Sequence, residues 1–549
     1  MSMEPLPFKT PPNANIRESP SRRLIDSTLE AVSSLTPELV IALCGPIGSP
    51  LHETAAEVEK VLSDSGYRAS TIRLSGIITI NAAMVNMAVD GSSKFNRTNS
   101  LIDIGDKLRE KYGADILAKI AIAKISADRQ QAFGPSDDAA KDTEQPHELK
   151  IAQQRACHIV DSIKNQSELD LLRLIYGDAL FAIGVFSPPA IRRQTLLQPG
   201  QFSEDEIERL IDKDSGEEFS HGQSVRNTFP ACDFFLRVDE PIFEQTEKKH
   251  LALAQIGVKL KRLFGLLFHT TIVSPTSEEN AMYAAASASR NSACLSRQVG
   301  AAVTSAAGEI LALGWNDVPQ AGGGLYGKPI LNGTTQMQQS QSDKRCYSLP
   351  NRKCHNDEEK RGIARKIAEI LVQAGLLDKT HIESAIEKIS SDSRVKDLIE
   401  FSRAVHAEMH AILGASRVAG ERIVGGKIFV TTYPCHACAR HIIAAGISEV
   451  QYIEPYRKSM ATRLHQDALS ESADAKDKVR IVQFEGVAPR RFIDLFEAGV
   501  RKDKGVLSLF SEKDARPSTR VSLKAIPRLE EAVVTELTEK ELKLPSLDA

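Results

Sequence analysis

Along the first half of the chain, short apolar runs alternate with amphipathic segments. Residues 39–44 (LVIALC) form an uninterrupted apolar run that predicts a buried strand, and the apolar spacing over 52–64 predicts an amphipathic helix. Residues 155–180 predict a further helix and a charged connector. Because alternating strands and helices are typical of an α/β layer fold, we expect a parallel sheet with flanking helices over 37–245. Two more apolar runs predict strands at 180–186 and 233–237.

The second half has a different order of elements. An Ala-rich stretch at 281–291 predicts a helix, and two strands follow that are joined by the turn at Ala307-Gly308. The long segment 320–400 comes next, and its length exceeds an ordinary connection, so we interpret it as a functional insertion. The two strands are expected at 299–304 and 309–313, and the insertion is expected to hold helices at 358–375 and 380–400.

Two predicted helices and one strand frame a cluster of His, Glu and Cys residues. Residues 404–416 predict a helix that begins near His406, and 427–432 (KIFVTT) predict a short buried strand. The run after Pro434 predicts another helix. Cys435 is therefore expected at a helix N-terminus, where the helix dipole favours a thiolate.

His406 and Glu408 form an H-x-E motif, and Pro434, Cys435 and Cys438 form a P-C-x-x-C motif. Together they are the sequence signature of zinc-dependent nucleobase deaminases. One imidazole and two thiolates hold the metal ion and leave a fourth position for a water molecule, which becomes the nucleophile. The alternatives are a structural zinc knuckle, for which His436 and His441 are the nearby additional ligands, and ordinary buried thiols.

Glu408 is expected to move protons at this site. Two thiolates cancel the charge of zinc, so the bound water is acidified less than in an all-histidine site and a carboxylate must take its proton. Glu408 would then protonate the ring nitrogen of the base and help ammonia leave. The alternative is a solvated Glu408 on a helix surface.

Residues 282–319 resemble the deoxycytidylate deaminase branch of the cytidine deaminase-like superfamily. The matching pieces are ASRNS at 288–292, SRQVGAAV at 296–303 and GWN at 314–316. The resemblance implies that Asn316 hydrogen-bonds the sugar of a bound nucleotide and that Arg290 and Arg297 contact its phosphate oxygens. The alternatives are a turn residue for Asn316 and ordinary salt bridges for the two arginines.

The whole chain resembles the bacterial anti-phage dCTP deaminases, which join a P-loop nucleoside-kinase-like domain to a zinc deaminase domain. Phrases at 171–188, 221–229 and 450–465 add to the resemblance. It implies an α/β protein with an N-terminal P-loop kinase-like parallel sheet and a C-terminal cytidine deaminase-like α/β/α sandwich. It also implies hydrolytic deamination of dCTP and dCMP to dUTP and dUMP, which starves phage DNA synthesis. An inhibitory small RNA and a homo-oligomer are the further partners that it implies.

The turn after the first apolar run departs from a phosphate-binding loop. Gly45 and Gly48 lie between a strand and a helix, but Ser49 and Pro50 follow where that loop has Lys and then Ser or Thr. We therefore expect a degenerate loop without efficient kinase chemistry. Backbone N–H groups around Gly45, Gly48 and Ser49 could still hold a phosphate; the preferred alternative is a structural turn.

Four residues could form a second, structural zinc site, as the resemblance suggests for an insertion of this kind. They are Cys294, Cys346, Cys354 and His355, whose spacing is irregular. The alternative is free thiols on a loop.

Composition narrows the function. A net charge of −3, 5% aromatic residues and a single Trp give no basic groove or stacking surface for nucleic acid. The chain has no apolar run of 18 residues and no apolar signal segment at its start, so we expect no membrane partner and a cytoplasmic location. Besides a nucleotide deaminase, the open alternatives are a polynucleotide cytosine or adenosine deaminase and a catalytically silent nucleotide-sensing module.

These patterns divide the chain into five parts. Residues 1–24, 134–147 and 526–549 are expected to be disordered because they are polar or Pro-rich. The parts are a disordered segment at 1–36, the kinase-like domain at 37–245, a connecting helix at 246–275, the zinc deaminase domain at 276–500 with its insertion at 320–400, and an extension and tail at 501–549.

Overall fold

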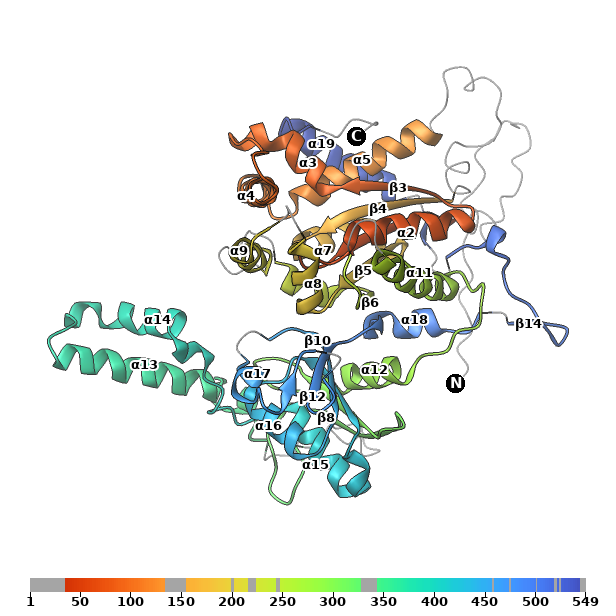
Figure 1. Ribbon diagram of the computed structural model, residues 1–549. Coiled ribbons are helices and arrows are strands. Elements are labelled where there is room, and N and C mark those ends of the chain that lie inside the picture. The colour runs from red at the N-terminus through yellow and green to blue at the C-terminus, as the bar shows by residue number, and fades with distance from the viewer. Residues whose placement is uncertain are drawn as a thin grey trace, which may run out of the picture.

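Two six-stranded sheets, one above the other in Figure 1, form the centre of the protein. In the computed structural model, the described residues are 35–133, 155–198, 202–215, 224–242, 247–326, 343–456, 459–472, 475–499, 501–517, 521–522 and 525–543. The segments 1–24 and 134–147, for which we expect disorder, lie outside the described residues. No described helix is both long enough and apolar enough to span a bilayer.

The first sheet has the strand order β13-β6-β5-β2-β4-β3, and all of its neighbouring strands run parallel except β13. The apolar run at 39–44 is its central strand, as predicted. Residues 155–180 contain the predicted helix, α7 (Gln166–Tyr176), but they also contain β4, which we did not predict. The strand was missed because Cys157, Ile159 and Val160 face helices on both sides of the sheet and give no clear period. The strands are β2 (Leu39–Cys44), β3 (Arg68–Arg73), β4 (Ala156–Ile163), β5 (Leu180–Phe186) and β6 (Phe234–Arg237).

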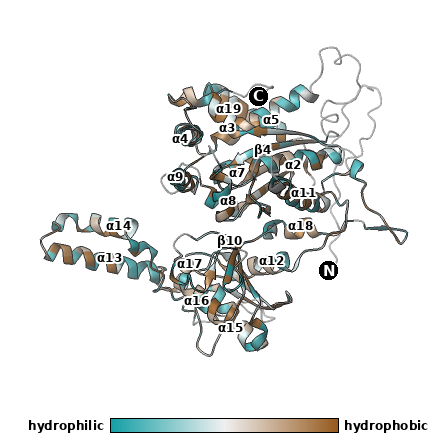
Figure 2. Cartoon of the chain, in the orientation of Figure 1, coloured by the Kyte–Doolittle hydropathy of each residue, from teal (hydrophilic) through white to brown (hydrophobic). Residues whose placement is uncertain are grey.

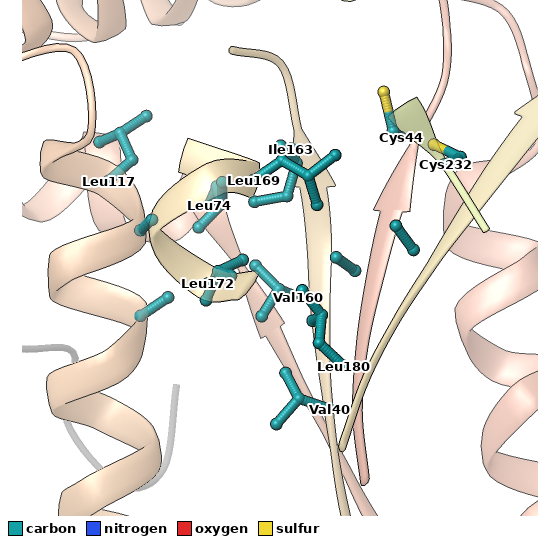
Figure 3. Close-up of a cluster of buried hydrophobic side chains, with 14 of the residues drawn as sticks. Val40, Cys44, Leu74, Leu117, Val160, Ile163, Leu169, Leu172, Leu180 and Cys232 are labelled. Atoms are coloured by element: carbon teal, nitrogen blue, oxygen red, sulfur yellow. The ribbon is translucent and has the colours of Figure 1, made fainter. Parts of the chain in front are cut away.

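Helices cover both faces of this sheet. Alternate residues of β2 serve the two faces: Leu39 and Ile41 pack with α2 (Leu51–Asp64) and α11 (Glu247–Leu267), whereas Val40 packs on the opposite side. Figure 3 shows the Val40 side, where the strands meet side chains of neighbouring helices. The helices of that face are α3 (Leu74–Asn81), α4 (Lys94–Tyr112), α5 (Ile116–Phe133) and α7 (Gln166–Tyr176).

The second sheet has the order β11-β12-β10-β9-β7-β8. Strand β7 runs antiparallel to both of its neighbours, and the others are parallel. Helix α12 (Ser277–Ser289) packs on one face, and α15 (Ala407–Ala419) and α16 (His436–Ala444) pack on the other. The strands are β7 (Gly300–Thr304), β8 (Ile310–Trp315), β9 (Lys427–Thr432), β10 (Glu449–Glu454), β11 (Leu469–Ser470) and β12 (Val479–Gln483).

The insertion forms a helical hairpin that projects from the second sheet (Figure 1). It consists of α13 (His355–Gln373) and α14 (Ile382–Asp392), close to the two predicted helices. A small core around Ala364, Ala368 and Ile386 holds them together. Both helices carry hydrophobic and hydrophilic residues (Figure 2).

The two sheets are joined by a shared core. Strand β13 (Gly486–Val487) follows the second sheet in sequence but pairs with β6 of the first. Phe235 of β6 meets Phe484 edge-on, with ring centroids 6.0 Å apart. The buried carboxylate of Glu279 accepts hydrogen bonds from Arg262 and from the Val487 N–H. These contacts fix the position of the second sheet relative to the first.

The C-terminal segment is ordered where we predicted disorder. Helix α19 (Ile526–Glu539) packs against α5 and buries Val533 and Leu537 in the core of the first half. Residues 35–36, predicted to be disordered, form strand β1 (Leu35–Thr36), which pairs with β16 (Val521–Ser522). The apolar face of α19 is only one side of a polar helix, so composition alone did not reveal it.

Candidate metal centre and nucleotide cavity

Two helix starts bring the three predicted metal ligands together. His406 is the N-cap residue of α15 and Cys435 is the N-cap residue of α16, whereas Cys438 lies in the first turn of α16. The Nδ1 atom of His406 is 3.2 Å from Sγ of Cys438 and 3.3 Å from Sγ of Cys435. The ordinary buried-thiol alternative is therefore disfavoured, because the two thiols and the imidazole converge on one point.

The donor set fits a zinc ion. The ligand atoms of His406, Cys435 and Cys438 all lie within 4.8 Å of one another, as the corners of a tetrahedron require, and no other such group exists among the described residues. His436 and His441 are not part of this group, so neither closes it as a structural knuckle. The hydrogen bond with Cys438, followed by that with His406, lowers the pKa of the Cys435 thiol to about 4, which favours the thiolate that binds metal.

Glu408 lies beside the ligand group without belonging to it. It sits in the first turn of α15, its side chain is buried, and it lines the same cavity as His406 and Cys435. Burial raises the pKa of Glu408, and the neighbouring His406 acts in the opposite direction. The solvated-surface alternative for Glu408 is wrong because its side chain is buried. A carboxyl group with a raised pKa can both accept and donate a proton.

A close approach of strand and helix holds α15 in place. Gly314 of β8 lies against the start of the helix, where an added Cβ would come within 2.3 Å of the Ala407 carbonyl oxygen. The next residue, Trp315, donates its backbone N–H to Nδ1 of His410 at 3.2 Å. The G-W-N phrase thus positions the helix that carries His406 and Glu408.

The cavity beside the ligand group has a volume of about 270 Å³. Asn316 and Arg297 line it, but Arg290 does not; its exposed guanidinium donates to the side-chain oxygen of Gln298 at 3.3 Å. Other lining residues that could meet a nucleotide are Ser296, Asn356, Lys360, Lys396 and Tyr433.

Asn316 is tied to the loop that carries Arg297. Its side-chain oxygen accepts the Val299 N–H at 2.8 Å, and its amide donates to the Arg297 carbonyl oxygen at 2.7 Å. Each group has one hydrogen-bonding position left for a ligand. The Arg297 guanidinium pairs with Glu454 at 2.6 Å and is half exposed.

The insertion contributes cationic side chains that the sequence motifs did not indicate. Lys360 of α13 and Lys396 both line the cavity, and the Lys360 ammonium donates to the Lys396 carbonyl oxygen at 3.0 Å. Lys360 also lies 3.9 Å from Asp357. The sequence signal was only the unusual length of the insertion.

The four residues of the second zinc prediction gather at one place. Cys294, Cys346, Cys354 and His355 line a small cavity of about 20 Å³. Their ligand atoms do not all lie within 4.8 Å of one another, as those of the described His/Cys/Cys group do. The second site stays a prediction.

The degenerate phosphate-loop turn already holds a carboxylate. Asp214 accepts the Ile47 N–H at 2.7 Å, and the ammonium of Lys164 bonds to Asp214 at 2.8 Å and to the Gly45 carbonyl oxygen at 2.7 Å. Gly48 has a φ of +82°, and Ser49 has no hydrogen-bond partner for its buried hydroxyl. An anion at this turn would have to displace Asp214.

Comparison with known proteins agrees with the metal centre. Residues 275–454 match the family described as the cytidine and deoxycytidylate deaminase zinc-binding region. ComE operon protein 2 of Bacillus subtilis (strain 168) is 48% identical over 56 residues, which are 10% of this chain and 29% of that protein. The deoxycytidylate deaminase of Enterobacteria phage T2 is 44% identical over 55 residues, again 10% and 29%. The chain thus spans about three-tenths of the length of these curated relatives.

A solved structure is similar over a larger part of the chain. The dCMP deaminase of the cyanophage S-TIM5, in complex with dCMP and dUMP, is 20% identical and covers 39% of this chain and 100% of its own, with a TM-score of 0.22. From the family match and the His/Cys/Cys geometry, residues 275–454 hold a cytidine and deoxycytidylate deaminase-type zinc-binding region, and its metal is Zn²⁺.

Proposed function

We propose that the protein deaminates dCTP and dCMP hydrolytically to dUTP and dUMP. The observation that carries the proposal is the convergence of His406, Cys435 and Cys438 beside the buried carboxylate of Glu408, on the wall of one cavity. The relatives named as deoxycytidylate deaminases support the substrate class.

The geometry supports a role for each of these residues in the proposed reaction. A zinc ion held by the three ligands would supply an activated water as the nucleophile. Glu408 takes the proton of that water, delivers it to the ring nitrogen and then assists departure of ammonia. Asn316 offers its remaining hydrogen-bonding positions to the sugar, and Arg297 meets the first phosphate.

The basic side chains of the insertion support a triphosphate as one substrate. Lys360 and Lys396 line the cavity together with Arg297, so three basic residues lie on its wall beside the acidic Asp357 and Asp397. A triphosphate carries more negative charge than a monophosphate and gains more from each added cation. We therefore include dCTP as well as dCMP.

Side-by-side assays of dCTP, dCMP, CTP and a cytosine-containing oligonucleotide test the proposal. We expect dUTP and dUMP from the first two substrates, detected by chromatography. Conversion of the oligonucleotide alone would favour a polynucleotide deaminase. No conversion of any substrate by fully zinc-loaded protein would favour a nucleotide-sensing module.

Lys360→Gln tests the triphosphate contact. We expect KM for dCTP to rise about 5- to 30-fold, corresponding to about 1–2 kcal/mol for a charge-assisted hydrogen bond, and KM for dCMP to change less. Lys366→Gln is the matched control, because Lys366 is exposed on the same helix and does not line the cavity. Equal changes for both substrates would remove Lys360 from the triphosphate contact.

An anti-phage role is the biological side of the same proposal. Destroying deoxycytidine nucleotides would deprive an infecting phage of precursors for its DNA. Plaque counts on cells that express the wild-type chain or the Glu408→Gln variant test this role; equal counts would contradict it. We also propose that a small RNA inhibits the protein and that the protein is a homo-oligomer. Analysis of nucleic acid that copurifies with the protein tests for the RNA. The native mass of the protein tests the oligomeric state.

A further inference from the structure

A second cavity, of about 340 Å³, lies between the two sheets. It shares no lining residue with the cavity of the zinc-binding region. The first half contributes Phe186, Arg192 and Phe229, and the second half contributes Tyr452 and Val482. Cavities of this size at a junction of two domains are common places for small-molecule ligands.

Acidic and basic side chains both line this cavity. Two of its carboxylates are occupied: Asp214 binds Ile47 and Lys164, and Glu471 accepts the hydroxyl of Tyr433 at 3.0 Å. Asp212 also has a partner. Each of the three acidic residues that line the cavity therefore already has a partner.

The arginines of the cavity are less well satisfied. The Nε atom of Arg192 is buried without a hydrogen-bond partner among the described residues, and Nη1 donates to the Ile47 carbonyl oxygen at 3.3 Å. Burial lowers the pKa of Arg192, and the nearby charges of Asp214 and Glu471 act in the opposite direction. Arg226 is partly buried, and burial and the neighbouring charge of Arg297 lower its pKa, whereas Glu454 acts in the opposite direction. A bound anion would accept the hydrogen bond that the buried Nε of Arg192 lacks.

We infer that this interdomain cavity binds a nucleoside phosphate at a site separate from the metal centre. Arg192 and Arg226 supply donors for phosphate oxygens, for which a planar guanidinium is well suited. Phe186, Phe229 and Tyr452 supply aromatic faces and edges for a base. The volume of about 340 Å³ suits a molecule of nucleotide size.

Tyr433 links this cavity to the metal centre. Tyr452, which lines the interdomain cavity, meets Tyr433 edge-on with ring centroids 4.9 Å apart. Glu471, in the same cavity, accepts the Tyr433 hydroxyl. Tyr433 itself lines the zinc-side cavity and is separated from Cys435 by a single residue, Pro434. Movement of Tyr452 or Glu471 would therefore reach the loop that carries a metal ligand.

Titration calorimetry of the full-length Glu408→Gln protein tests the binding site without turnover. The probes are ATP, dTTP and inorganic phosphate, with excess dUMP present to fill the zinc-side cavity. We expect at least one nucleotide to bind, and Arg192→Gln to weaken that binding about tenfold or more. Arg193→Gln is the matched control, because Arg193 is the exposed neighbour and pairs with Glu208. This test does not depend on deaminase activity.

Val482→Trp gives an independent test by filling the cavity from the other sheet, and it replaces Arg192→Gln if that variant does not fold. It should abolish the same binding event. Absence of binding by all three probes, or equal affinity in the wild-type, Arg192→Gln and Val482→Trp backgrounds, would overturn the inference. Binding of inorganic phosphate with the same affinity as the nucleotides would also overturn it, because the base would then contribute nothing.

Discussion

Glu408 is the residue whose burial matters most for chemistry. Replacing it by Gln keeps the side-chain volume but removes the group that can take and return a proton. We expect kcat to fall about 10²- to 10⁴-fold, the range for a positioned general acid–base group. Zinc content, measured by elemental analysis, should stay at the wild-type level because Glu408 is not part of the ligand group. Loss of zinc together with activity would show instead that Glu408 supports the metal.

His158 links protonation to the stability of the first half. It is buried in β4, its Nδ1 bonds to Ser70, and its Nε2 has no hydrogen-bond partner, while Glu38 lies 3.6 Å away and Arg129 is also near. Burial, the largest cause, lowers the pKa of His158 below its ordinary value of 6.5. The folded protein therefore holds this imidazole neutral.

The sign of the pH effect follows from proton counts. Below about pH 6.5 the unfolded chain takes up a proton at His158 that the folded protein does not, so the free energy of unfolding falls as the pH falls towards the folded-state pKa. Urea titrations between pH 8 and pH 5 should show this loss in the wild type. A His158→Asn variant should show a smaller loss over the same interval, and an identical slope in the two proteins would contradict the assignment.

At the scale of elements, the metal centre depends on how closely α15 approaches β8. Gly314→Ala would place a methyl group 2.3 Å from the Ala407 carbonyl oxygen and 2.4 Å from the Ala411 nitrogen. Helix α15 must then move outward, and His406 and Glu408 move with it. We expect the free energy of unfolding to fall by about 1–3 kcal/mol, together with weaker zinc binding.

A second glycine substitution separates this steric effect from the general effect of replacing a helix or strand glycine by alanine. Gly362 of α13 has open space around its Cβ position and lies away from the metal centre. Gly362→Ala should leave zinc affinity unchanged and stabilise the helix slightly. A comparable loss of zinc affinity in Gly314→Ala and Gly362→Ala would contradict the explanation that close packing of α15 on β8 holds the metal ligands.

At the scale of the whole molecule, the C-terminal helix α19 stabilises the N-terminal half. The buried guanidinium of Arg129 bonds to Glu38 at 3.0 Å and to Glu530 of α19, and Glu530 also accepts the Tyr176 hydroxyl at 2.8 Å. Glu530→Ala would leave part of this buried charge unpaired. We expect a loss of about 3–5 kcal/mol in the free energy of unfolding.

The neighbouring position is the control for this prediction. Glu531 is exposed on the same helix, so Glu531→Ala should change stability by less than about 0.5 kcal/mol. Denaturant titration of both variants measures the difference. A small effect of Glu530→Ala would mean that α19 is dispensable for the first half.

The sequence predicted the local parts of the fold well. Strands at 39–44, 180–186 and 427–432 were recognised because each is a short apolar run between polar turns. Strand β4 and helix α19 were missed, since β4 is buried on both faces and α19 has one apolar stripe in a polar tail. Pairing of β13 with β6 was also invisible, because it joins residues 251 positions apart between Phe235 and Gly486.

By itself, the sequence determined the metal chemistry of this protein. His406, Cys435 and Cys438 lie in short motifs at two helix starts. Because each motif spans only a few residues, it can be recognised without tertiary information. The tertiary structure alone decided that Arg290 turns away from the cavity, that Lys360 and Lys396 reach it, and that a second cavity lies between the sheets. The physical reason is distance along the chain: a side chain far from a motif reaches the site only through packing of whole elements, which no local pattern records.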